Sequence, residues 1–244
     1  DYGKLSGSEQ QTLILTHQNL MKTEVIPAYQ GLMTGLEALR GTGKNPRGLA
    51  YFKGGKAYYL YLLQSQTGTY VPVKEIEKRL SRQLSSEIGI VGNMLRQNPE
   101  LLTTLNKGIS FTEMRPAQIL SSLQKKISSD FPPLEDVSFE LKTVHDSMKD
   151  YLDTGTPNVI YINPAANYQG LELFTTLAHE GFPGHLYQTV SFERQNPSGI
   201  RNLLDTSGFA EGWATYVEPF AYEYAADYIL DSSASDLARL AWLN

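Results

Sequence analysis

Two histidines with a glutamate directly after the first form the most chemically suggestive feature of the chain. His179 and Glu180 are adjacent, and His185 follows six positions after the first histidine. A His-Glu pair with a second histidine close behind it on a helix is how many zinc peptidases present two metal ligands and a general base. The residue types therefore indicate metal-dependent hydrolysis as the candidate chemistry.

The spacing of the two histidines differs from the common one, in which the second lies four positions after the first. Four positions on an ideal helix place two side chains about 40° apart on one face. A separation of six on an unbroken helix places them about 120° apart and roughly 9 Å apart along the axis. Two nitrogens that must each lie about 2.0–2.1 Å from one zinc ion cannot do so from those positions.

The segment between the histidines predicts how this conflict is resolved. Pro183 has no N–H group to donate, and its ring crowds the carbonyl of His179. Phe182 precedes a proline and is therefore displaced from helical angles, and a glycine on each side adds freedom. We expect a bulge that breaks the helix and, by looping out two residues, returns His185 to the register of the common motif. The alternative is a kinked core helix whose two histidines merely flank the kink.

A catalytic zinc ion usually has three protein ligands, and the third is expected from a different element. Glu211 is the natural candidate, because it lies between small residues in an otherwise apolar helical segment, where a carboxylate is costly to bury unless paired or metal-bound. Glu218, seven residues later, shares its face. We predict that Glu218, and Thr215 between them, support the ligands or replace one. The alternative is that the two glutamates are solvated helix positions.

These residues suggest a division of roles. Glu180 is the predicted general base, acting on zinc-activated water as the nucleophile and passing the proton to the leaving amine. The segment 158–163 is the strongest strand signal, and its residues Asn158, Val159, Ile160 and Tyr161 are placed to pair with an extended peptide. An oxyanion donor is also needed, for which His145 and Tyr151 are the candidates.

Composition excludes several classes of function. The net charge is −5, so the composition does not indicate the basic surface that nucleic-acid binding requires. No apolar run approaches the roughly 20 residues of a membrane span, so no transmembrane segment is expected. The chain has no cysteine, which excludes disulfides and thiolate ligands. It starts at Asp1 without a methionine, so we expect a processed form whose targeting segment, with a lipid anchor as one option, has been removed.

Hydrophobic periodicity predicts a mainly α chain with a small β-sheet. Long helices are expected over 8–39, with a kink at Pro27, and over 72–95 and 208–228. Strands are expected over 137–144 and 158–163.

The two motifs together resemble a known family. His-Glu-Gly-Phe-Pro-Gly-His with a later Glu-Gly-Trp-Ala-x-Tyr-x-Glu is similar to the bacterial family called domain of unknown function 885. Weaker likeness covers most of the chain, including the segment 158–163. The resemblance implies a zincin-like (gluzincin-like) helical metallopeptidase architecture with one zinc ion, held by His179, His185 and Glu211, and with Glu180 as the catalytic residue.

The resemblance also carries expectations about the whole protein. Many members of the family look exported or lipid-anchored. We therefore expect this protein in the cell envelope, the periplasm or the extracellular space, and a cytoplasmic location is the alternative. The family has a longer segment between the counterparts of Tyr151 and Asn158 and continues past Asn244. We therefore expect 1–244 to be a single metallopeptidase-like domain that is a fragment of a longer chain and part of a larger helical fold.

Two functions are compatible with these sequence features. The first is a zinc-dependent peptidase that takes a peptide substrate. The second is a non-catalytic cell-envelope binding protein that keeps the peptidase fold. Glu180 favours the first, because a site that only binds ligands has no need of an acid–base carboxylate beside the first histidine.

Overall fold

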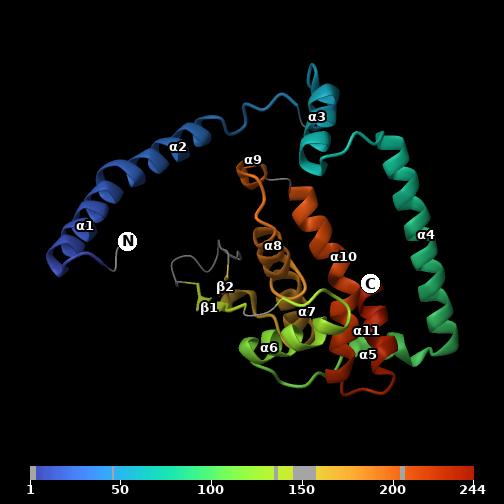
Figure 1. The fold of residues 1–244 in the computed structure, drawn as a ribbon. Helices are drawn as coiled ribbons and strands as arrows, with labels where there is room; N and C mark the ends of the chain where they lie inside the picture. Colours follow the sequence, from blue (N-terminus) through green and yellow to red (C-terminus); the bar gives the residue numbers. More distant parts are fainter. Residues whose placement is uncertain (1–3, 46, 135–136, 145–157, 204–206) are drawn as a thin grey trace. The chain divides into compact units, whose positions relative to one another are not determined.

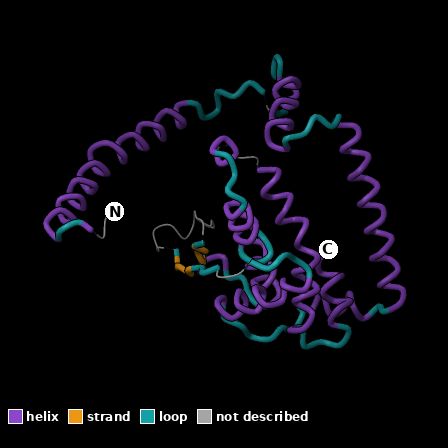
Figure 2. Tube along the Cα trace, viewed as in Figure 1, coloured by secondary structure: helices purple, strands orange, loops and turns teal. Residues whose placement is uncertain are grey.

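A computed structural model describes residues 4–45, 47–134, 137–144, 158–203 and 207–244 of the chain (Figure 1). The chain divides into two compact units, residues 1–60 and 61–244. Helices account for most of both units, as the trace coloured by secondary structure shows (Figure 2). The prediction of a mainly helical chain is confirmed.

The first unit is built on one long helical stretch. It comprises α1 (Gly7–Leu20), a π-helical turn (Met21–Val25) and α2 (Ile26–Ala38). Ser6 caps α1, since its hydroxyl accepts from the Glu9 amide and its own amide donates to the Glu9 carboxylate. Pro27 stands in the first turn of α2, where a missing N–H is tolerated, directly after the wide π-helical turn.

The second unit is an assembly of helices with a small sheet. Its helices, the first of which begins in the first unit, are α3 (Gly55–Thr67), α4 (Val73–Gln97), α5 (Glu100–Lys107), α6 (Pro116–Lys126), α7 (Gly170–Glu180), α8 (His185–Arg194), α9 (Gly199–Leu203), α10 (Ser207–Ala225) and α11 (Ala234–Leu243). The helices predicted over 72–95 and 208–228 correspond to α4 and α10. Among the described residues, no helix combines the length and the apolarity needed to cross a membrane.

The sheet of the described residues has two parallel strands, β1 (Glu140–Thr143) and β2 (Val159–Ile162), with Glu140 opposite Val159. The first strand is shorter than the predicted 137–144. The amide of Glu140 donates to the Asn158 carbonyl, and the amide of Val144, directly after β1, donates to the Ile162 carbonyl. Both acceptors lie on the same edge of β2. In a parallel ladder this alternation turns the backbone groups of Val159 and Tyr161 toward the other edge of β2.

The main core lies where α6, α7, α8 and α10 pack together under the sheet. The α7 and α10 helices lie side by side and contribute the fully buried Phe174 and Val217. Ile160 of β2 closes the core from the sheet side. This packing fixes α7 against α10, and those two helices carry most of the predicted site residues.

A tyrosine–carboxylate contact near the C-terminal end of α10 predicts how this unit responds to acid. The hydroxyl groups of Tyr224 and Ser129 donate to Asp130 over 2.7 and 2.8 Å, and these bonds hold the pKa of Asp130 below its ordinary value of 3.8. A carboxylate with a lowered folded pKa contributes stability above its unfolded pKa and loses it as the pH falls through the folded pKa.

Tyr224→Phe should therefore lower the stability of the fold at pH 7, and the deficit should shrink as the pH falls below about 4, where Asp130 takes up its proton in the unfolded chain. Urea unfolding at pH 7 and at pH 3 measures both deficits. An equal deficit at the two pH values would show that the contact does not depend on the ionised carboxylate.

Candidate metal centre

The predicted break between the two histidines is present. The α7 helix ends at Glu180 and α8 begins at His185. The Gly184 amide donates to the Ala178 carbonyl over 3.0 Å, and the Tyr187 amide donates to the Gly181 carbonyl over 3.1 Å. Both bonds span six residues instead of the four of an α-helix. Two extra residues are thus inserted, as the bulge interpretation requires.

The bulge is directed into the protein. Phe182 and Pro183 are fully buried, and the Phe182 ring packs edge-on against Phe139 beside the sheet, with centroids 5.9 Å apart. At Gly184 there is no room for a side chain, because an added Cβ would lie 1.7 Å from the His179 carbonyl oxygen. This glycine therefore permits the close return of the chain toward the first histidine.

Gly184→Ala should destabilise the protein by about 1–3 kcal/mol, because the backbone must move to accept the added carbon. Gly212→Ala provides a matched control. An added Cβ there meets nothing within 4 Å, and alanine is favoured over glycine in a helix by roughly 0.5–1 kcal/mol. Thermal unfolding of the two variants should shift in opposite directions. A Gly184→Ala protein as stable as the parent would contradict the described loop.

The break brings the two imidazoles together. The rings of His179 and His185 have centroids 4.8 Å apart and planes inclined by 86°, and about a quarter of each side chain is exposed. The ligand atoms of these two histidines and of Glu180 all lie within 4.8 Å of one another. The structure thus gathers the three residues of the first motif into one cluster that could hold a metal ion.

Glu211 faces the cluster from α10, and its side chain is 63% exposed, so the burial expected for this carboxylate is not found. Its two carboxylate oxygens each lie 3.6 Å from the Nε2 atom of a different histidine, one from His179 and the other from His185. A separation of 3.6 Å is too long for a hydrogen bond. Two donors that each lie about 2.0–2.1 Å from a tetrahedral zinc ion are roughly 3.3 Å apart. The spacing thus fits ligands around a common ion better than direct pairing.

Glu218 supports the cluster from the same helix. Its carboxylate lies 3.2 Å from Nδ1 of His179, within hydrogen-bonding distance. A carboxylate at one ring nitrogen fixes the tautomer and orientation of a metal-binding histidine, so that the other nitrogen can bind the metal. The predicted supporting position of Glu218 agrees with this geometry. Thr215, predicted beside it, is exposed and lines a groove of about 400 Å³ with Tyr216 and Trp242.

The remaining predicted residues fall into two groups. His145 and Tyr151, the candidate oxyanion donors, lie outside the described residues. The predicted peptide-binding residues Asn158, Val159 and Tyr161 lie on or next to β2 and are partly or fully exposed, whereas Ile160 is buried in the core.

Two residues near the cluster were not predicted as part of the site. The indole nitrogen of Trp213 donates to the Pro183 carbonyl over 2.9 Å. Burial raises the pKa of Tyr222, against the effect of a hydrogen bond with Thr175. Tyr222 lies one helical turn after Glu218, and Thr175 one turn before His179. Both residues are thus one turn away from a pair that already links the two helices, Glu218 and His179. This spacing is the signal that could have indicated a further polar contact between α7 and α10.

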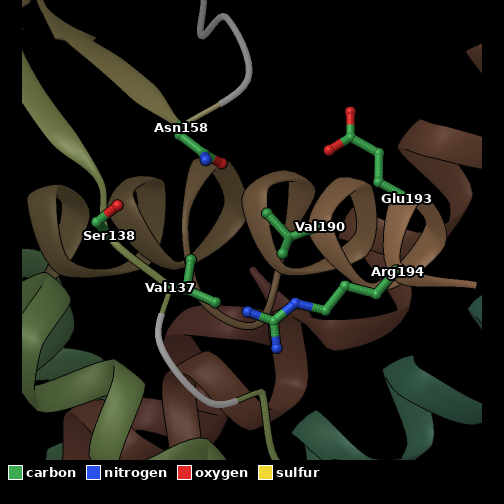
Figure 3. A pocket seen from close by; sticks show the side chains of 6 residues that line it. All are labelled: Val137, Ser138, Asn158, Val190, Glu193 and Arg194. Carbon is green, nitrogen blue, oxygen red and sulfur yellow. The ribbon is translucent and has the colours of Figure 1, made fainter.

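A separate pocket lies at the C-terminal end of α8 (Figure 3). It has a volume of about 320 Å³ and is lined by Val137, Ser138, Asn158, Val190, Glu193 and Arg194. The Arg194 side chain extends toward Val137, whereas the carboxylate of Glu193 points away from it. His185 stands at the other end of the same helix, so this pocket is distinct from the histidine cluster.

Comparison with known proteins adds a fold and a family. No curated protein matches the chain. Its fold is similar to the crystal structure of a protein named "putative lipoprotein" from Colwellia psychrerythraea, with a TM-score of 0.72 and 19% identity. The match covers 99% of this chain and 46% of that one, so the chain spans about half the length of its structural neighbour. The model of the family "Bacterial protein of unknown function (DUF885)" matches residues 2–243, and the chain belongs to that family.

Proposed function

We propose that the chain carries a single-zinc site of the zincin type that hydrolyses peptide bonds. His179, His185 and Glu211 would hold the ion, and Glu180 would act as the general base. The observation that carries the proposal is the pair of 3.6 Å distances from the two Nε2 atoms to the two oxygens of one carboxylate. Nitrogen and carboxylate donors in this number are the usual protein ligands of a catalytic zinc ion.

The arrangement of charges supports a metal over a plain ion-pair cluster. Hydrogen bonds between a charged imidazole and a carboxylate are short, about 2.7–2.9 Å, whereas both contacts of Glu211 are 3.6 Å. Glu218 lies at hydrogen-bonding distance from a ring nitrogen of the cluster, and the nitrogen that it contacts is Nδ1 of His179. The two Nε2 atoms both face the carboxylate of Glu211, as ligands of one ion would.

Each residue would have a defined task in hydrolysis. A bound zinc ion would acidify water and polarise the carbonyl of the scissile bond. Glu180 would take the proton released by water and deliver it to the leaving amine, since its carboxylate belongs to the same 4.8 Å cluster. Glu218 would hold the His179 ring in the orientation that binding requires. His145 and Tyr151 remain the candidates for the oxyanion donor.

The sheet supports the proposal that the substrate is a peptide. The backbone groups of Val159 and Tyr161 point away from β1, so an extended peptide could add to that edge as a further strand. Ile160 lies against the start of the bulge. A Cβ atom added to Gly181 would be 3.4 Å from the Cδ1 atom of Ile160. The strand is therefore close to the segment that joins the two histidines, where a bound peptide would meet the site.

The name of the structural neighbour supports an exported location with a lipid anchor. That chain is about twice as long, so we also propose that the activity belongs to a longer protein in which this fold is one part.

Elemental analysis and peptide digestion test the proposed function together. Protein reconstituted with zinc and dialysed should retain about one ion per chain and should cleave members of a mixed peptide library. Bound zinc without turnover, in this chain and in the longer protein alike, would favour a non-catalytic binding protein that keeps the fold. Absence of retained zinc would overturn the proposal.

A further inference from the structure

The contact between Trp213 and Pro183 joins the two halves of the candidate site. Pro183 lies in the bulge between the histidines, and Trp213 stands on α10 two residues after Glu211. The indole N–H donates to the Pro183 carbonyl over 2.9 Å. Pro183 is fully buried, so without this donor its carbonyl would lose a hydrogen bond that water could not readily replace. One hydrogen bond therefore connects the histidine segment to the helix that presents the third carboxylate.

The direction of that hydrogen bond is fixed by the packing of the indole. Trp213 stacks on Tyr187 with planes 9° apart, and the edge of Phe131 meets it with centroids 6.1 Å apart. Tyr187 follows His185 by two residues, and its hydroxyl donates to the Pro132 carbonyl over 2.8 Å. The indole ring therefore packs on α8 and also donates to the bulge. A shift of α8 or of the bulge relative to α10 would disturb the packing or the hydrogen bond of the ring.

We infer that Trp213 is a positioning residue for the metal site and that its N–H sets the distance between Glu211 and the two histidines. The inference rests on the proposed zinc function and adds a residue to it. Distances between ligands must be held within a few tenths of an ångström for tight binding, and hydrogen bonds behind the ligands commonly supply that control. Loss of the N–H alone should then weaken zinc binding about 10- to 100-fold.

The test removes the N–H and keeps the shape of the ring. Trp242→Phe makes Trp213 the sole tryptophan, because the chain contains two, and serves as the reference protein. Trp213 is then replaced during expression by benzothienylalanine, in which sulfur stands where the N–H was, or by 7-azatryptophan, which retains the N–H. Zinc affinity is measured by chelator competition. The absorption spectrum at saturating cobalt reports the coordination of the ion.

The benzothienylalanine protein should bind zinc about 10- to 100-fold more weakly than the reference, and its cobalt spectrum should move toward that of a Glu211→Ala variant. The 7-azatryptophan protein should match the reference in both measurements. Weaker binding with an unchanged cobalt spectrum would mean that Trp213 is only structural and would overturn the inference, as would unchanged affinity. A reference protein that binds no zinc would overturn the proposed function and this inference with it.

Discussion

His179→Ala should abolish stoichiometric zinc binding. Its imidazole is expected to supply one of three ligands, and it is the only histidine of the described cluster that also contacts Glu218. We expect the loss of affinity to exceed the roughly 10- to 100-fold typical of replacing a residue that merely supports a ligand. Glu218→Gln, which removes the supporting charge and keeps the ligand set, should fall within that smaller range.

The chain offers a matched control for this experiment. His17 is an exposed histidine on α1 in the first unit, and His17→Ala should leave zinc binding unchanged. Elemental analysis after dialysis gives the stoichiometry, and chelator competition gives the affinity for each variant. Equal zinc retention by the His179→Ala and parent proteins would remove the basis for the proposed site.

Glu180→Gln should separate binding from catalysis. The substitution keeps the size of the side chain and removes its ability to accept a proton, so the zinc content should stay near one ion per chain. Loss of a general base typically costs about 10²- to 10⁴-fold in rate. We therefore expect turnover of peptides to fall within that range while metal affinity changes little.

Steady-state hydrolysis of a peptide found in the library digest measures this effect, with zinc content determined on the same samples. Glu193→Gln is the matched control, because Glu193 lies on α8 in the wall of the separate pocket. Its turnover should equal that of the parent. A Glu180→Gln protein with full activity would show that another group accepts the proton.

Much of the candidate site follows from local sequence. The His-Glu pair, the second histidine and the glycines and proline between them specify a helix, a break and a new helix through backbone effects that act over a few residues. The same local rules predict α4, α10 and both strands. The two-residue insertion was also predictable, because register on a helix depends only on the number of residues between two positions.

Tertiary structure decided what the inserted residues do and which groups meet. Phe182 and Pro183 are buried and not extruded into solvent, because Phe182 packs in the core against Phe139 and the Pro183 carbonyl accepts from Trp213 of α10. The hydrogen bond from Trp213 spans 30 residues, and no local pattern specifies a partner at that distance. The placement of Glu211 between both Nε2 atoms likewise depends on how α7 and α10 pack. Sequence thus determined the residue types and the break, whereas packing between helices set the distances on which metal binding depends.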